Sequence, residues 1–121
     1  MVRMIFRHIS GVRATEIDVV QLGAHRELVL GRAPSAAVRF DPRRDMDVGR
    51  HHARIAWSET DPARFLLVDL ASRNGTFVNG ARVEGPIALQ SGDVVRLGHR
   101  GPEVEILVEH TPPLTALERG A

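Results

Sequence analysis

The sequence contains no cysteine, no lysine and no tyrosine, and it has only one tryptophan and four phenylalanines. Without cysteine the chain has no disulfide, no thiol nucleophile and no thiolate metal site, and it carries no sign of an oxidising compartment. No segment approaches the roughly 18 consecutive apolar residues of a membrane helix. The N-terminus, Met-Val-Arg-Met-Ile-Phe-Arg-His, is too short and too charged for a signal peptide. We therefore expect a cytoplasmic protein that does not insert directly into a membrane.

The length and the charge balance narrow the class further. A chain of 121 residues with 43% hydrophobic and 26% charged residues has the composition of one globular domain. The net charge is only +1, so we do not expect nucleic acid as a partner, because that function requires a clearly basic face. All 16 basic residues are arginine, which either reflects codon use in a GC-rich genome or suits forked recognition of phosphate.

Turn-forming residues recur about every 8 to 12 residues and no segment has a convincing helical period, which is typical of an all-β sandwich or barrel. We expect the segment 64–70 to be a strand covered on both faces, because it is dense in apolar residues. Residues 1–110 form the predicted domain. Residues 111–121, which include Pro112-Pro113, are predicted to be a flexible tail or a linker stub. The other predicted strands are 2–8, 15–22, 26–30, 38–40, 52–57, 77–78, 81–84, 87–89, 94–97 and 103–109.

Three polar motifs stand between the predicted strands. They are Gly31-Arg32, then Gly49-Arg50-His51-His52, then Ser72-Arg73-Asn74-Gly75-Thr76 followed by Asn79-Gly80. Each Asn-Gly pair is a strong local turn signal, because both residues tolerate positive φ. Two such turns leave room for only a very short strand at Phe77-Val78 and predict a small, rigid polar surface.

In this order the three motifs resemble the forkhead-associated (FHA) domain family over roughly residues 3 to 109. The resemblance implies a β-sandwich of about eleven mostly antiparallel strands, of the FHA/SMAD-like type, with binding loops at one end. It also implies a module that binds phosphothreonine peptides. The expected partner is a threonine-phosphorylated protein, such as a Ser/Thr kinase or its substrate.

The resemblance also assigns roles to single residues. Arg32 and Arg50 are expected to contact the phosphate, with Gly49 offering its backbone N–H, and Asn74 is expected to hold the main chain of the peptide. Ser72 and Arg73 belong to the same expected binding surface, while Gly31, His52, Gly75 and Thr76 are expected to support it. Gly49 departs from the family, which usually has serine there, so one hydroxyl donor is missing.

Alternatives from the residues themselves stay open. Arg32 also suits a surface salt bridge, Arg73 also suits a solvated position, and Asn74 also suits a turn that needs positive φ before Gly75. Gly49 keeps open a second function, in which the fold mediates phosphate-independent association or self-assembly.

Catalysis and cofactor binding have little support in the sequence. His51 and His52 are adjacent in the sequence at the start of the predicted strand 52–57. Neighbouring residues of an extended chain point to opposite faces, so these two cannot easily share a metal. None of the five serines lies in a Gly-x-Ser-x-Gly motif, and no glycine-rich segment opens a helix. We therefore expect no enzyme activity, no metal and no cofactor.

Overall fold

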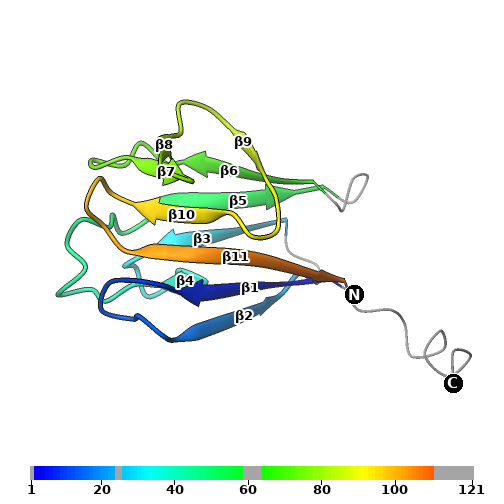
Figure 1. The fold of residues 1–121 in the computed structure, drawn as a ribbon, viewed down its shortest axis with the longest axis horizontal. Coiled ribbons are helices and arrows are strands. Elements are labelled where there is room, and N and C mark those ends of the chain that lie inside the picture. The colour runs from blue at the N-terminus through cyan, green and yellow to red at the C-terminus, as the bar shows by residue number, and fades with distance from the viewer. Residues whose placement is uncertain (1, 24–25, 59–63, 111–121) are drawn as a thin grey trace, which may run out of the picture.

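The computed structural model describes residues 2–23, 26–58 and 64–110, and this part of the chain contains eleven strands and no helix. The strands are β1 (Val2–His8), β2 (Ile17–Gln21), β3 (Glu27–Gly31), β4 (Val38–Arg39), β5 (Ala53–Trp57), β6 (Phe65–Asp69), β7 (Thr76–Val78), β8 (Ala81–Arg82), β9 (Ile87–Leu89), β10 (Val94–Leu97) and β11 (Glu103–His110). They form a six-stranded sheet in the order β2-β1-β11-β10-β7-β8 and a five-stranded sheet in the order β4-β3-β5-β6-β9 (Figure 1). The predicted sandwich of about eleven strands is confirmed, and β3 with β4 is the parallel pair among otherwise antiparallel neighbours. None of the described residues belongs to a helix long and apolar enough to cross a membrane.

The core lies between the two sheets, and alternation along each strand places it there. In β1, for example, Met4 and Phe6 are fully buried while Arg7 faces solvent. Val104 and Ile106 of β11 and Ile55 of β5 are also fully buried. Burying one such side chain is worth about 1.5–3 kcal/mol, so the alternating pattern determines which face of each strand is turned inward.

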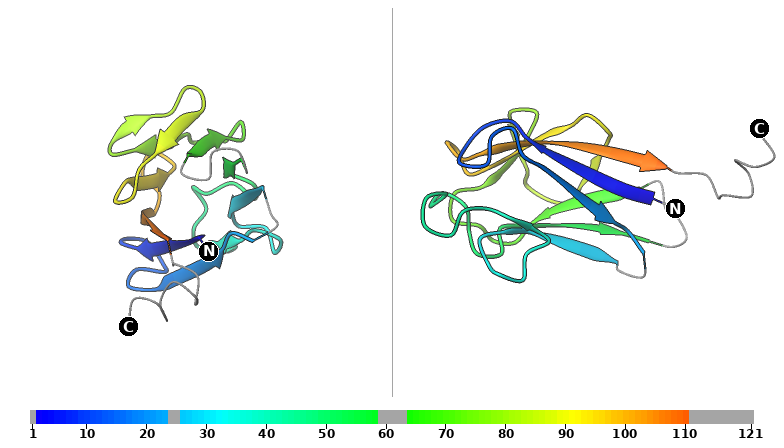
Figure 2. Two further views of the ribbon diagram at one scale, coloured as in Figure 1. Left: turned by 90° about the vertical axis from the view of Figure 1, so that its right-hand side faces the viewer. Right: turned by 90° about the horizontal axis from the view of Figure 1, so that it is seen from below.

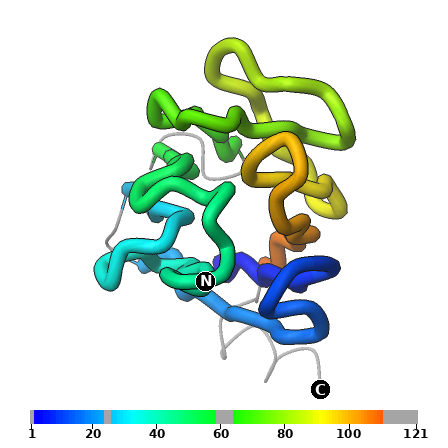
Figure 3. Tube along the Cα trace, turned by 90° about the vertical axis from the view of Figure 1, so that its left-hand side faces the viewer, coloured from blue at the N-terminus to red at the C-terminus, as the bar shows by residue number. Residues whose placement is uncertain are grey.

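The loops relevant to function gather at one end of the sandwich. Figure 1 shows them on the left, while β1 begins and β11 ends on the right. Figure 2 shows the two sheets as two layers with the loops at the same end. Figure 3 looks directly onto this end, which we call the loop end. It is formed by the connections 9–16, 32–52, 70–75 and 98–102.

Several predicted strand bounds differ from the structure by one or two residues, and two differences have a clear physical reason. The strand predicted at 64–70 is β6, and only one of its faces is covered, because Phe65 and Leu67 are buried whereas Leu66 and Val68 are half-buried. The five-stranded sheet packs on the core through one face only. The second strand starts at Ile17 rather than at Thr15, because Thr15 has a φ of +79°, outside the extended region. The predicted tail, 111–121, lies outside the described residues.

Candidate functional site

The end of β3 lies unusually close to the loop that precedes β5, and Gly31 makes this possible. A Cβ atom on Gly31 would lie 2.1 Å from the carbonyl oxygen of Arg50, so any side chain there would collide with backbone. The backbone N–H of Arg32 donates to the carbonyl of Gly49 at 3.0 Å, and the N–H of Ala33 donates to that of Arg50 at 3.0 Å. These contacts set the spacing of the first two motifs.

His52 joins the second motif to the third. Its Nδ1 accepts the N–H of Gly49 at 2.9 Å, and its Nε2 lies 2.8 Å from the carbonyl of Gly75, to which it donates. The side chain is fully buried. Burial lowers the pKa of His52 below its ordinary value, although the hydrogen bond to Gly75 and the charge of Asp69 oppose the shift. The imidazole is therefore neutral, with its proton on Nε2, and it holds two loops in one arrangement.

The hydrogen bond of the Gly49 backbone N–H differs from the one expected from the sequence. We expected its N–H to face a ligand, but this N–H donates to His52 instead. Because a glycine at this position also lacks a hydroxyl, residue 49 offers neither its N–H nor a side-chain donor to a ligand.

The loop 70–75 is organised around Asp69, which the sequence analysis overlooked. Its carboxylate accepts the N–H of Ser72 at 3.0 Å, the hydroxyl of Ser72, and the hydroxyl of Thr76 at 2.6 Å. Burial alone would raise the pKa of Asp69, but the hydrogen bonds from Ser72 and Thr76 outweigh burial and hold that pKa below its ordinary value. The spacing Asp-x-x-Ser just after a strand is a turn signal that could have identified this carboxylate.

Ser72 stabilises the loop itself. Its hydroxyl donates to Asp69 and accepts the N–H of Gly75 at 3.0 Å. The hydroxyl of Ser72 is thus engaged within the protein, and the expected place of Ser72 on the peptide-binding surface stays a prediction. Thr76 is fully buried and has the same role as Ser72 towards Asp69.

Asn74 bridges two loops. Its side-chain Nδ2 donates to the carbonyl of Asp47 at 3.0 Å, which ties the loop 70–75 to the loop before β5. Within the described residues no hydrogen bond engages its Oδ1, so this acceptor remains for a ligand N–H. The alternative that Asn74 was selected for positive φ is wrong, because the turn there places only Gly75 at positive φ (+83°), whereas at the second turn both Asn79 (+49°) and Gly80 (+87°) have it.

Arg32 holds the loop between β4 and β5. Its Nε donates to the carbonyl of Val48, and its Nη1 donates to the carbonyl of Pro42 at 2.9 Å. The alternative of a surface salt bridge is wrong, because no carboxylate of the described residues pairs with Arg32. The expected contact with a phosphate stays a prediction, and two of the guanidinium donors, Nε and Nη1, are already bonded to backbone. In this structure the Arg32 side chain holds the loop 41–48 in place, and its positive charge remains at the loop end.

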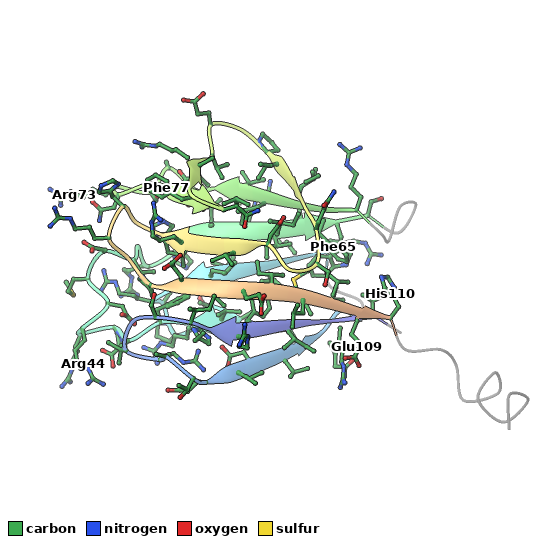
Figure 4. The ribbon with its side chains drawn as sticks, viewed as in Figure 1. Arg44, Phe65, Arg73, Phe77, Glu109 and His110 are labelled. Carbon is green, nitrogen blue, oxygen red and sulfur yellow. The ribbon has the colours of Figure 1, made fainter. Side chains whose placement is uncertain are left out.

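Besides Arg43 and Arg100, the exposed cations of this end include Arg50 and Arg73. Neither side chain makes a hydrogen bond or an ion pair with any described residue, and Figure 4 places Arg73 at the tip of the loop end. Several other arginines are neutralised: Arg3 by Glu109, Arg7 by Glu105, Arg13 by Asp18, Arg44 by Asp41 and Arg54 by Glu27. The loop end therefore presents positive charge without internal partners, on a backbone fixed by His52 and Asn74. Such an arrangement is suited to binding an anion.

The two adjacent histidines differ in burial. His52 is buried between the loops, whereas His51 is exposed. Nowhere in residues 2–23, 26–58 and 64–110 do three or more metal-ligating side chains come together.

Comparisons with known proteins agree with this geometry. The family model of the FHA domain matches residues 28–98. FHA domain-containing protein FhaA of Mycobacterium tuberculosis (strain ATCC 25618 / H37Rv) is 44% identical over 71 residues, which are 59% of this chain and 12% of FhaA. The chain thus spans only a small part of the length of this curated relative.

Two solved structures are similar over most of the chain. One comes from a structural and functional analysis of phosphothreonine-dependent FHA domain interactions; it is 31% identical, has a TM-score of 0.69, and the match covers 91% of this chain and 99% of that one. The other is the FhaA FHA domain, crystallised in complex with an intracellular domain; it is 33% identical with a TM-score of 0.65, and the match covers 85% and 98% of the two chains.

Proposed function

The chain belongs to the FHA domain family, and on that premise we propose that it is a non-catalytic module that binds phosphothreonine peptides through its loop end. A phosphothreonine brings about −1.5 to −2 charges and three strong acceptor oxygens. Arg50 and Arg73 offer guanidinium forks that match such a group. Asn74 offers its free Oδ1 to an N–H of the peptide main chain.

The observation that carries this proposal is the combination of unpaired charge and fixed backbone. Arg50 and Arg73 are exposed and have no partner among the described residues, while His52 and Asn74 tie together the loops that bear them. Because the loop backbone is held before any ligand arrives, the ordering cost on binding is mainly that of the two arginine side chains. Two or three charge-assisted hydrogen bonds of about 1.5–3 kcal/mol each would supply much of the roughly 8 kcal/mol of micromolar affinity.

The partner that we propose is a threonine-phosphorylated protein, such as a Ser/Thr kinase or one of its substrates. The relatives support this choice, because one of the similar structures was studied for phosphothreonine-dependent interactions. Neither nucleic acid nor a catalysed reaction enters the proposal. The cytoplasmic location stays a prediction.

Titration calorimetry with a degenerate phosphothreonine peptide library, and with its unphosphorylated counterpart, tests the proposal. We expect micromolar binding that requires the phosphate and that weakens at least tenfold in Arg50→Gln. Arg7→Gln is the matched control, because Arg7 is exposed but is paired with Glu105 on the opposite side of β1 from the core. Phosphate-independent binding, or equal losses in both variants, would contradict the proposal.

A second candidate function, phosphate-independent association, is favoured by an apolar surface on β2. Ile17 and Val19 are 57% and 50% exposed on this edge strand. Sedimentation velocity tests the self-assembly form of this candidate. Concentration-dependent association that Val19→Glu abolishes would support self-assembly through β2, and a monomer at every concentration would remove it.

A further inference from the structure

Arginines on the outer face of the six-stranded sheet fall into two groups. Arg3 and Arg7 each have a glutamate on the neighbouring strand β11 as partner. Nearer the loop end, Arg82 of β8 and Arg96 of β10 pair with no carboxylate of the described residues, although Glu103 is the cross-strand neighbour of Arg96. Arg82 and Arg96 therefore lack an ion pair even though a glutamate is present on the same face of the sheet.

The unpaired arginines surround one aromatic ring. Phe77 of β7 is the cross-strand neighbour of both Arg82 and Arg96, so the three side chains share one face of the sheet. The guanidinium carbon of Arg96 lies 4.4 Å from the centroid of the Phe77 ring, and the ring of His99 lies 5.8 Å from it, centroid to centroid. We call Phe77, Arg82, Arg96 and His99 the Phe77 cluster.

The cluster holds Arg96 in place without neutralising it. The Nε of Arg96 is buried and has no hydrogen-bond partner, so the aromatic ring rather than an acid positions the guanidinium. Arg82 and His99 are exposed at its sides. A partly desolvated cation that forms no ion pair with a described carboxylate favours an anion that arrives from outside.

The Phe77 cluster adjoins the candidate peptide site. A Cβ atom on Gly75 would lie 3.3 Å from the guanidinium of Arg82 and 3.3 Å from the Phe77 ring. The turn that carries His99 also lies against the loop 70–75, because a Cβ atom on Gly98 would lie 3.5 Å from the Cβ of Asn74. Figure 4 shows Phe77 and Arg73 at the same end of the molecule, far from Glu109 and His110.

We propose that the Phe77 cluster is a second anion subsite, which takes a phosphate or a carboxylate borne by the same peptide a few residues from its phosphothreonine. This inference rests on the proposed function, and it makes the preferred ligand doubly anionic. Arg82 and Arg96 supply two guanidinium forks to such an anion. One further charge-assisted contact corresponds to a gain in affinity of about tenfold.

Peptides with one fixed phosphothreonine test the subsite. A phosphoserine, a glutamate or a glutamine is placed at each position up to about four residues on either side, which an extended chain spans in roughly 13 Å. We expect at least one position where phosphoserine or glutamate improves affinity about tenfold over glutamine. Comparison of the two anions then shows whether the subsite takes phosphate or carboxylate.

Two variants locate the gain. Arg82→Gln, and Arg82→Gln combined with Arg96→Gln, should remove the gain while leaving the singly phosphorylated peptide bound as before; Arg7→Gln should change neither. Since Arg96 packs on Phe77, the single exposed variant Arg82→Gln decides the matter if the double variant proves unstable. If no position improves the affinity of the wild-type protein, or if the improvement survives in Arg82→Gln, the second subsite is refuted while the proposed function stands. If no phosphopeptide of either kind binds, the proposed function and this inference both fail.

Discussion

Replacing His52 by alanine tests how the loop end is held together. The buried imidazole accepts from Gly49 at 2.9 Å and donates to Gly75 at 2.8 Å. Alanine removes both hydrogen bonds and leaves the N–H of Gly49 without its partner, whereas the carbonyl of Gly75 still accepts from Gly98 at 2.8 Å. The partly buried N–H of Gly49 left without an acceptor, the lost bond to Gly75 and the space left by the ring together cost roughly 2–4 kcal/mol of unfolding free energy.

The matched control is the neighbouring histidine. His51 is exposed and forms no hydrogen bond with the described residues, so His51→Ala should change the unfolding free energy by about 0.5 kcal/mol or less. Urea unfolding at neutral pH, followed by tryptophan fluorescence of Trp57, measures both variants. Equal stabilities of His52→Ala and His51→Ala would refute the bridging role of His52.

The same pair of variants should separate further with pH. Burial lowers the pKa of His52, so the folded protein binds this proton less tightly than the unfolded chain does. The stability that neutral His52 contributes is complete above the unfolded value of about 6.5 and is lost as the pH falls from there through the folded pKa. Unfolding free energies of His51→Ala should therefore decline below about pH 6.5, more steeply than those of His52→Ala. Parallel pH profiles would show that His52 does not titrate in this way.

Three further predictions concern the backbone and its support. Asp69→Ala should lower the unfolding free energy by roughly 2–4 kcal/mol at neutral pH, because three donors lose their acceptor. The difference from wild type should shrink only in acid, as the pH falls from about 3.8 through the lower folded pKa of Asp69. Urea unfolding at a series of pH values from acid to neutral checks both expectations. Thr15→Gly should raise the melting temperature by a few degrees, since a β-branched residue at a φ of +79° is strained by about 1 kcal/mol; an unchanged or lower value would contradict the strain. Gly31→Ala should fold poorly or lose more than about 3 kcal/mol of unfolding free energy, because its Cβ would collide with the carbonyl of Arg50. Gly85→Ala is the control and should be nearly neutral, because the space around Gly85 is open. Circular dichroism melts compare the two variants.

The strands and the general location of the site could be predicted because their causes are local. Alternating apolar residues, such as Met4 and Phe6, determine which face of a strand is buried, and Asn79-Gly80 forms the left-handed turn that its composition favours. Thr15 escaped prediction, because its positive φ arises from the return of the chain against β1 rather than from its own preference.

The partners of individual polar groups could not be predicted in the same way. The N–H of Gly49, the hydroxyl of Ser72 and the Nε of Arg32 each bond to a group of the protein itself. These choices depend on where other loops lie in space, which residue type and spacing do not determine. The structure also shows that Asp69, the last residue of β6, organises the loop 70–75.

The central claim is that the loop end binds a phosphothreonine peptide, and amide chemical-shift mapping tests it most directly. Isotope-labelled protein is titrated with a phosphothreonine peptide and then with the same peptide after dephosphorylation. We predict phosphate-dependent shifts concentrated at residues 49–51, 72–75 and 98–100, with the edge strand β2 unaffected. Shifts that centre on Ile17 and Val19, or that persist without the phosphate, would contradict the account.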